Sequence, residues 1–76
     1  MLARLQEEGQ IAAAVGTLPP LLGKILRRRY GLDDGNHETL TQIGKSLRLS
    51  RERIRQLEAK AIGMLRDKLE FMKTAA

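Results

Sequence analysis

Aliphatic residues in the second half of the chain recur at helical spacing, and this periodicity constrains the fold more than any other feature. They step by three or four residues along one stripe: Ile54, Leu57, Ala61, Leu65 and Leu69. At about 100° per residue these positions share one face, which predicts an amphipathic helix from about residue 51 to about residue 72. Because no segment alternates as a strand does, we predict an all-α fold of four to five helices without a sheet.

Proline and glycine divide the first half of the chain. Residues 2–15 predict a first helix, which Gly9 weakens. Proline at positions 19–20 fits the first turn of a second helix, which should run to about Tyr30 and end at Gly31. The spacing along that helix predicts one buried face: Leu18, Leu22, Ile25, Leu26 and Tyr30. Residues 31–38, GLDDGNHE, predict a polar loop.

Two helices joined by a short turn are predicted between about residues 39 and 61. Thr39 and Gln42 fit a capping box at the start of the first helix. Gly44 suits a place where the second helix crosses close by. The turn includes Arg48, whose left-handed conformation would cost about 1 kcal/mol. Ser50 fits the N-cap of the second helix. The sequence therefore predicts a helix-turn-helix.

Basic residues concentrate in this motif. The chain carries a net charge of +5, and six basic residues face only two acidic ones between Lys45 and Lys60. Glu52, Gln56 and Lys60 lie on the side of the last helix opposite the apolar stripe, with Arg51 and Arg55 on one flank and Arg53 on the other. Arginine can bind guanine, glutamate can accept from cytosine and glutamine can pair with adenine. The pattern favours a helix that reads the major groove, with an ordinary solvated helix face as the alternative.

Other classes of function find little support. A chain of 76 residues buries roughly 60% of its unfolded surface, which leaves little room for a catalytic cleft. No nucleophile–base arrangement is recognisable, so we expect no enzyme. A lone histidine, His37, and no cysteine argue against a metal site or cofactor. No apolar run approaches 18 residues, so we expect no membrane span, and the missing cysteines suit a reducing cytoplasm.

A family resemblance rests on these same residues. The run from Leu40 to Arg66, LxxIGKxLxLSRERIRQLEAKAIxxLR, follows LPP and ILRRRYGLDDG. It resembles region 4, the C-terminal DNA-binding domain of bacterial sigma factors of the sigma-70 family, over about residues 17–66. The resemblance implies the winged-helix-like but sheet-free fold type of that domain. It also implies binding to the −35 promoter element in the cytoplasm, at the nucleoid, with an apolar groove for the tip of the RNA polymerase β flap.

The resemblance also assigns site residues. Arg51, Glu52 and Gln56 are implied to contact base edges. The residues implied to hold the DNA backbone are Arg29, Thr39, Leu40, Ser50, Arg53, Arg55 and Lys60. The sequence departs from the family at Leu21 and Leu22, where an arginine and a glutamate are usual. Nothing resembles the region that reads the −10 element, so residues 1–76 are expected to be a single domain of a longer sigma factor.

More apolar residues are present than the core of so small a domain needs. We expect part of this surplus to form an exposed surface for the β flap, for an anti-sigma factor or for an activator. The residues assigned to it are Leu21, Leu22, Ile62, Phe71 and Met72. Two alternatives stay open. One is a free-standing helix-turn-helix regulator with its own dimer contact, and the other is a helical docking module for an acidic partner. No small-molecule ligand is expected.

Overall fold

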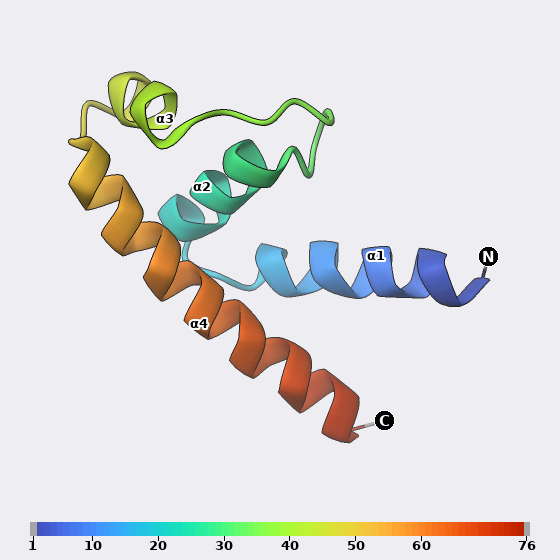
Figure 1. The fold of residues 1–76 in the computed structure, drawn as a ribbon. Helices are drawn as coiled ribbons and strands as arrows, with labels where there is room; N and C mark the ends of the chain where they lie inside the picture. The colour runs from blue at the N-terminus through green and yellow to red at the C-terminus, as the bar shows by residue number, and fades with distance from the viewer. Residues whose placement is uncertain (1, 76) are drawn as a thin grey trace.

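Four helices make up the fold of this computed structural model, which describes the backbone of residues 2–75 and the side chains of residues 9–71. They are α1 (Leu2–Gly16), α2 (Pro20–Tyr30), α3 (Leu40–Leu47) and α4 (Arg51–Ala75) (Figure 1). No strand occurs in residues 2–75, so the all-α prediction is confirmed. The last helix extends to Ala75, three residues beyond the predicted end.

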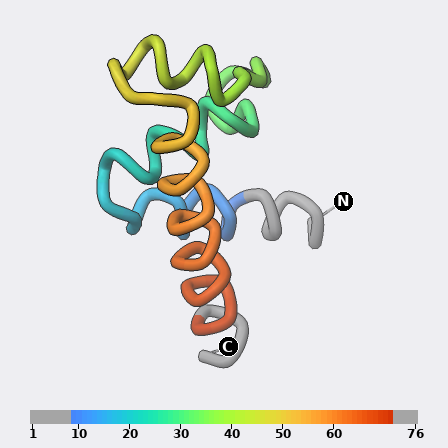
Figure 2. The backbone as a smooth tube through the Cα atoms, turned by 60° about the vertical axis from the view of Figure 1, so that its left-hand side comes forward, coloured from blue at the N-terminus to red at the C-terminus, as the bar shows by residue number. Residues whose placement is uncertain are grey.

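The long helix α4 is the axis of the molecule. Each of the other three helices packs against α4, and α2 also contacts α1 and α3. The N-terminal half of α4 lies beside α2 and α3, whereas its later turns project away from them (Figures 1 and 2). Only the N-terminal half of α4 is therefore enclosed by α2 and α3.

Local backbone chemistry ends α2 as predicted. Gly31 has φ 63° and ψ 38°, the left-handed conformation, and its N–H donates to the carbonyl of Arg27. A Cβ at this position would lie 2.8 Å from the carbonyl carbon of Gly35. Both the conformation and the tight packing therefore require glycine here, and the chain can turn at once into the loop that leads to α3.

The core lies where α1, α2 and α3 meet α4. Its buried side chains come from all four helices and the α1–α2 connection: Val15, Leu18, Leu22, Ile25, Leu26, Ile43, Ile54, Leu57 and Ala61. Leu47, Leu49 and Leu65, which the sequence pattern also turned inward, are half-buried against this cluster. The predicted apolar stripe of α4 is thus the side that faces the other helices, as far as residue 65.

Two positions on α2 differ from the predictions. The prediction that Leu22 is an exposed partner residue is wrong, because only 4% of its surface is accessible. Leu22 lies one turn from Leu18, Ile25 and Leu26, and it joins them in the core. Tyr30, at the last turn of α2, was predicted on the buried face but is 45% exposed.

Candidate nucleic-acid interface

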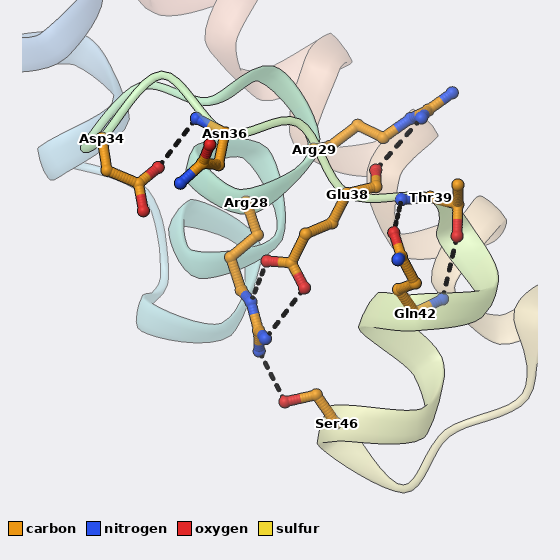
Figure 3. A network of polar contacts seen from close by, with 8 residues as sticks. All are labelled: Arg28, Arg29, Asp34, Asn36, Glu38, Thr39, Gln42 and Ser46. Carbon is orange, nitrogen blue, oxygen red and sulfur yellow. Dashed lines mark hydrogen bonds and ion pairs between the residues drawn. The ribbon is translucent and has the colours of Figure 1, made fainter.

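The first helix of the motif starts with the predicted capping box. The backbone N–H of Gln42 donates to the Thr39 hydroxyl at 3.1 Å, and the N–H of Thr39 donates to the Gln42 side-chain oxygen at 2.8 Å (Figure 3). Both side chains are thereby used to fix the start of α3. Thr39 and Leu40, implied to meet a phosphate, lie at the N-terminus of α3. The first backbone N–H groups of a helix have no partner within the helix, and they favour an anion.

A three-residue turn sets α4 against α3. Arg48 has φ 59°, the left-handed conformation whose cost was considered for this position, and the N–H of Leu49 donates to the Gly44 carbonyl at 2.8 Å. A Cβ at Gly44 would lie 2.6 Å from the Leu49 carbonyl oxygen and 3.5 Å from Ile54. The tightest contact at Gly44 is thus with the backbone of the turn, and only secondarily with α4, the helix that was expected there.

The N-terminus of α4 is capped and open to solvent. The Ser50 hydroxyl accepts from the N–H of Arg53 at 3.0 Å, as predicted. The first three turns of α4 expose every polar residue that was assigned to this face: Arg51, Glu52, Arg53, Arg55, Gln56 and Lys60. Ile54, Leu57 and Ala61 are buried on the other side. The structure therefore brings the implied base-contacting and phosphate-contacting residues of α4 together on one accessible surface.

A bidentate ion pair orders the centre of this surface. Nε and Nη2 of Arg55 donate to the two carboxylate oxygens of Glu52, at 2.9 and 2.6 Å. The hydrogen bonds from Arg55 lower the pKa of Glu52, and the same contact raises the pKa of Arg55. Glu52 is therefore an acceptor only, as a contact with the amino group of cytosine requires.

Arg29 is the implied phosphate residue on α2, and it has partners within the domain. Its Nε donates to Glu58 of α4 at 3.2 Å, and its Nη1 donates to the carbonyl of Glu38 at 3.2 Å. Glu58 is largely buried, with 15% of its side chain accessible. The Arg29 guanidinium therefore links α2, the loop before α3 and α4, besides any contact it makes with DNA.

Sequence reasoning missed the neighbouring Arg28. This residue donates to both oxygens of Glu38, at 2.7 and 3.1 Å, and to the hydroxyl of Ser46 at 2.8 Å (Figure 3). The hydrogen bond with Glu38 raises the pKa of Arg28. The sequence contained a hint of this ion pair, namely the basic run at residues 27–29 and the glutamate in the following loop. Their pairing depends, however, on how the loop returns over α2.

An apolar groove lies away from this polar surface, between α1, the end of α2 and α4. Its lining residues are Ile11, Leu26, Tyr30, Leu32, Ile62 and Leu65. A second apolar hollow continues along α4 past Leu65 to Leu69. Burial raises the pKa of Tyr30, and the negative charge of Glu58 adds to this effect. The predicted exposed groove therefore exists, but its members differ from the predicted set.

Among the expected partner residues whose side chains the structure describes, the groove includes only Ile62. Leu21 is 42% exposed on α2, outside the groove lining, and Phe71 is 72% exposed on the projecting part of α4. The side chain of Met72 lies outside the described residues. Ile11 and Leu32 were not expected. Neither belongs to the periodic faces of the motif helices, and only the path of α1 and of the loop brings them together.

Comparison with known proteins identifies the family. The family model for sigma-70 region 4 matches residues 14–67, which contain the whole helix-turn-helix. The chain belongs to the sigma-70 region 4 family. It is thus a sigma-factor DNA-binding domain, as the resemblance of its sequence indicated. The exposed polar face of α4 and the capped start of α3 belong to the matched segment.

Curated relatives include sigma factors from several bacteria. The chain is 51% identical over 57 residues to RNA polymerase sigma factor SigA of Clostridium acetobutylicum, covering 75% of the chain and 15% of that protein. It is 50% identical over 56 residues to SigA1 of Synechococcus elongatus, covering 74% of the chain and 14% of the relative. The principal sigma factor HrdD of Streptomyces coelicolor is 50% identical over 48 residues, covering 63% and 14%. The chain thus spans 14–16% of the length of the first relatives it matches.

Two further findings concern the described part of the chain. No helix there is both long and apolar enough to cross a membrane. Among the same residues, His37 and the acidic side chains form no group of three or more metal-ligating residues.

Proposed function

We propose that this chain is the region 4 module of a longer sigma factor and that it reads the −35 element of promoter DNA. The observation that carries the proposal is the exposed polar surface at the start of α4, beside a capped and solvent-accessible helix end. A helix of this kind fits the major groove, where each base pair presents a distinct pattern of donors and acceptors.

The proposed roles follow from chemistry and position. Arg51, Glu52 and Gln56 contact base edges, because they are exposed in the first two turns of α4. Phosphates are held by residues around this centre, namely Arg29, Thr39, Leu40, Ser50, Arg53, Arg55 and Lys60. The two helix N-termini add backbone N–H groups, which favour phosphate without reading sequence.

Base-pair substitution in the target tests this proposal. Fluorescence anisotropy of the 76-residue chain would compare a duplex containing a TTGACA-like hexamer with a scrambled duplex at one salt concentration. We expect the hexamer to bind more tightly, and each substituted base pair to cost about 1–3 kcal/mol of this preference. Equal affinity for both duplexes would contradict sequence reading. A complex of two chains with one hexamer, measured by sedimentation, would favour a free-standing dimeric regulator instead.

We also propose that the apolar groove docks on the β flap of RNA polymerase. Exposed apolar grooves in small domains accept the apolar face of a partner helix. Leu32 contributes to the groove lining and is 42% exposed, and Leu21 has the same exposure on a different face. These two leucines are a matched pair for a test. Anti-sigma factors or activators are proposed to compete for the same surface.

A binding assay with an isolated β flap would separate the two faces. We expect Leu32→Glu to weaken flap binding by about tenfold, because the new carboxylate must be desolvated in an apolar groove. Leu21→Glu should leave flap binding nearly unchanged, and the melting temperatures of both variants should stay close to that of the parent chain. The reverse order of effects would place the flap on the face of α2 that carries Leu21.

A further inference from the structure

Arg28, on α2, connects this helix with the loop that ends at Glu38 and with α3. Its Nε and Nη2 bind the carboxylate of Glu38 at 2.7 and 3.1 Å, and its Nη1 binds the Ser46 hydroxyl at 2.8 Å. The backbone takes part as well, because the N–H of Glu38 donates to the carbonyl of Arg28 at 3.0 Å. Arg28 thus holds residue 38 through both its side chain and its main chain.

The two partners of Arg28 flank α3. Glu38 immediately precedes Thr39, the N-cap of α3, whereas Ser46 lies in the last turn of that helix. Figure 3 shows the guanidinium between them, with the carboxylate on one side and the hydroxyl on the other. A single planar side chain on α2 therefore touches both the entry and the exit of α3. Since α3 is only eight residues long, this contact restrains its rotation and its sliding over α2.

The donors of Arg28 are used within the protein. Both the arginine and the glutamate are about 70% buried, with 28% and 29% of their side chains accessible. Five N–H donors are available in a guanidinium, and three of its nitrogens already have partners. By contrast, the contact of Arg27, on the same helix, among the described side chains is a long one of 3.8 Å with Asp33. Arg28 is therefore arranged to position α3 rather than to meet a phosphate.

We propose that Arg28 is a positioning residue for DNA recognition, acting through Glu38 and Ser46 to hold the N-terminus of α3 in register with the start of α4. This inference rests on the proposed DNA-binding function. Loss of the contact lets α3 shift, so Thr39, Leu40 and the turn before α4 no longer face the duplex in one arrangement. The affinity for the matched site falls although no DNA contact has been deleted.

Salt dependence distinguishes positioning from direct contact. Each phosphate contact contributes about 0.9 to the slope of log affinity against log salt concentration on duplex DNA. We expect Arg28→Gln and Ser46→Ala each to weaken binding to the matched hexamer by about threefold, a size typical of a partly exposed pair. The slope should stay as in the parent chain. Arg27→Gln is the matched control, because it removes the same charge from α2 without touching α3.

Rescue and spectroscopy complete the test. The exchange variant Arg28→Glu with Glu38→Arg should recover most of the lost affinity, since it restores opposite charges at the same places. A slope reduced by about 0.9 in Arg28→Gln would show a direct phosphate contact and overturn the proposal. An affinity equal to that of Arg27→Gln would overturn it too. Ser46→Ala changes no charge and keeps the test valid if Arg28→Gln does not fold.

The contact of Arg28 with Glu38 and Ser46 can also be tested without DNA. If the parent chain fails to prefer the hexamer over scrambled DNA, the proposed function fails while the positioning contact stays open to test. Backbone amide NMR shifts of Thr39, Leu40 and Leu47 should then move in Arg28→Gln and return in the exchange variant. They should stay in place in Arg27→Gln. Unmoved shifts in Arg28→Gln would contradict the positioning role.

Discussion

Glu52 and Arg55 are joined by two hydrogen bonds, 2.9 and 2.6 Å long, within one turn of α4. One is proposed to contact a base and the other a phosphate. In the free domain the carboxylate therefore fixes the guanidinium, and the guanidinium keeps the carboxylate ionised. Each residue would thus affect the proposed DNA contact of the other, and substitutions at either position should change more than one contact.

Removal of Glu52 should lower discrimination while raising general affinity. Glu52→Ala deletes a negative charge from the surface that is proposed to face DNA and releases Arg55 to bind phosphate. We expect tighter binding to scrambled duplex, and a loss of about 1–3 kcal/mol in preference at one cytosine position of the hexamer. Anisotropy titrations with single-base variants measure both effects. An unchanged preference at every position would exclude Glu52 from base contact.

Alanine substitutions at Arg51 and Lys60 should have different effects on DNA binding. Arg51→Ala should cost about 1–3 kcal/mol on the matched hexamer and relax the preference at one or two base pairs. Lys60→Ala, two and a half turns further along α4, should weaken all sequences about equally and reduce the salt slope by about 0.9. Titrations on matched and scrambled duplexes at several salt concentrations separate the two. Equal losses on both duplexes for Arg51→Ala would identify it as a phosphate contact.

Acid should weaken the Glu52–Arg55 contact. The pKa of Glu52 is lowered in the folded domain, so this carboxylate stabilises the fold above its unfolded pKa of about 4.3. That contribution is lost as the pH falls through the lower folded value. We expect the free energy of unfolding to fall more steeply below pH ~4.3 in the parent chain than in Glu52→Gln. Urea unfolding at several acidic pH values checks this, and identical pH profiles would contradict it.

Gly44 should not tolerate a side chain. A Cβ there would lie 2.6 Å from the Leu49 carbonyl oxygen, and a backbone atom cannot yield as a flexible side chain can. We expect Gly44→Ala to cost about 1–3 kcal/mol of stability and to shift α4 relative to α3. Gly63→Ala is the control, because nothing lies within 4 Å of a Cβ at Gly63 in the middle of α4. The control should gain about 1 kcal/mol from helix propensity. Thermal unfolding measures both.

Leu22 and its neighbour Leu21 should differ sharply in their effect on stability. Leu22 is 4% exposed in the core, whereas Leu21 is 42% exposed. We expect Leu22→Ala to cost about 2–5 kcal/mol, from lost burial and the cavity it leaves. Leu21→Ala should cost less than about 1 kcal/mol, close to an ordinary surface change. Denaturant unfolding followed by circular dichroism gives both values, and similar losses would contradict the burial of Leu22.

Local sequence chemistry predicted the helix ends, because each depends on a few neighbouring residues. The capping box at Thr39, the glycine that ends α2 and the serine before α4 were all assigned from the sequence, and each is confirmed. Leu22 shows where such reasoning fails. The helical spacing of Leu22 predicted a buried position. The opposite prediction, of an exposed position, came from the number of apolar residues compared with an assumed core size. The periodicity was the better guide, because it reflects the direction in which a side chain leaves the helix.

The contacts that cross between helices could not be predicted from spacing. Arg28 and Glu38 are separated by ten residues, and Arg29 and Glu58 by twenty-nine, so their pairing depends on the path of the loop and the packing of α2 on α4. The groove has the same origin, since Ile11 and Leu32 come from segments outside the helix-turn-helix. Residue types at these positions were informative only after the fold brought them together.

The unbroken length of α4 has a consequence for assembly. Gln56 on the polar surface and Leu65 in the groove belong to this one helix, nine residues apart. Nine residues advance about 13.5 Å along a helix and rotate two and a half turns, so the two side chains leave it in opposite directions. A duplex and a docked protein would thus approach from opposite sides without collision. Because both would bind the same rigid helix, the orientation of α4 on the docked protein would determine the direction of the DNA.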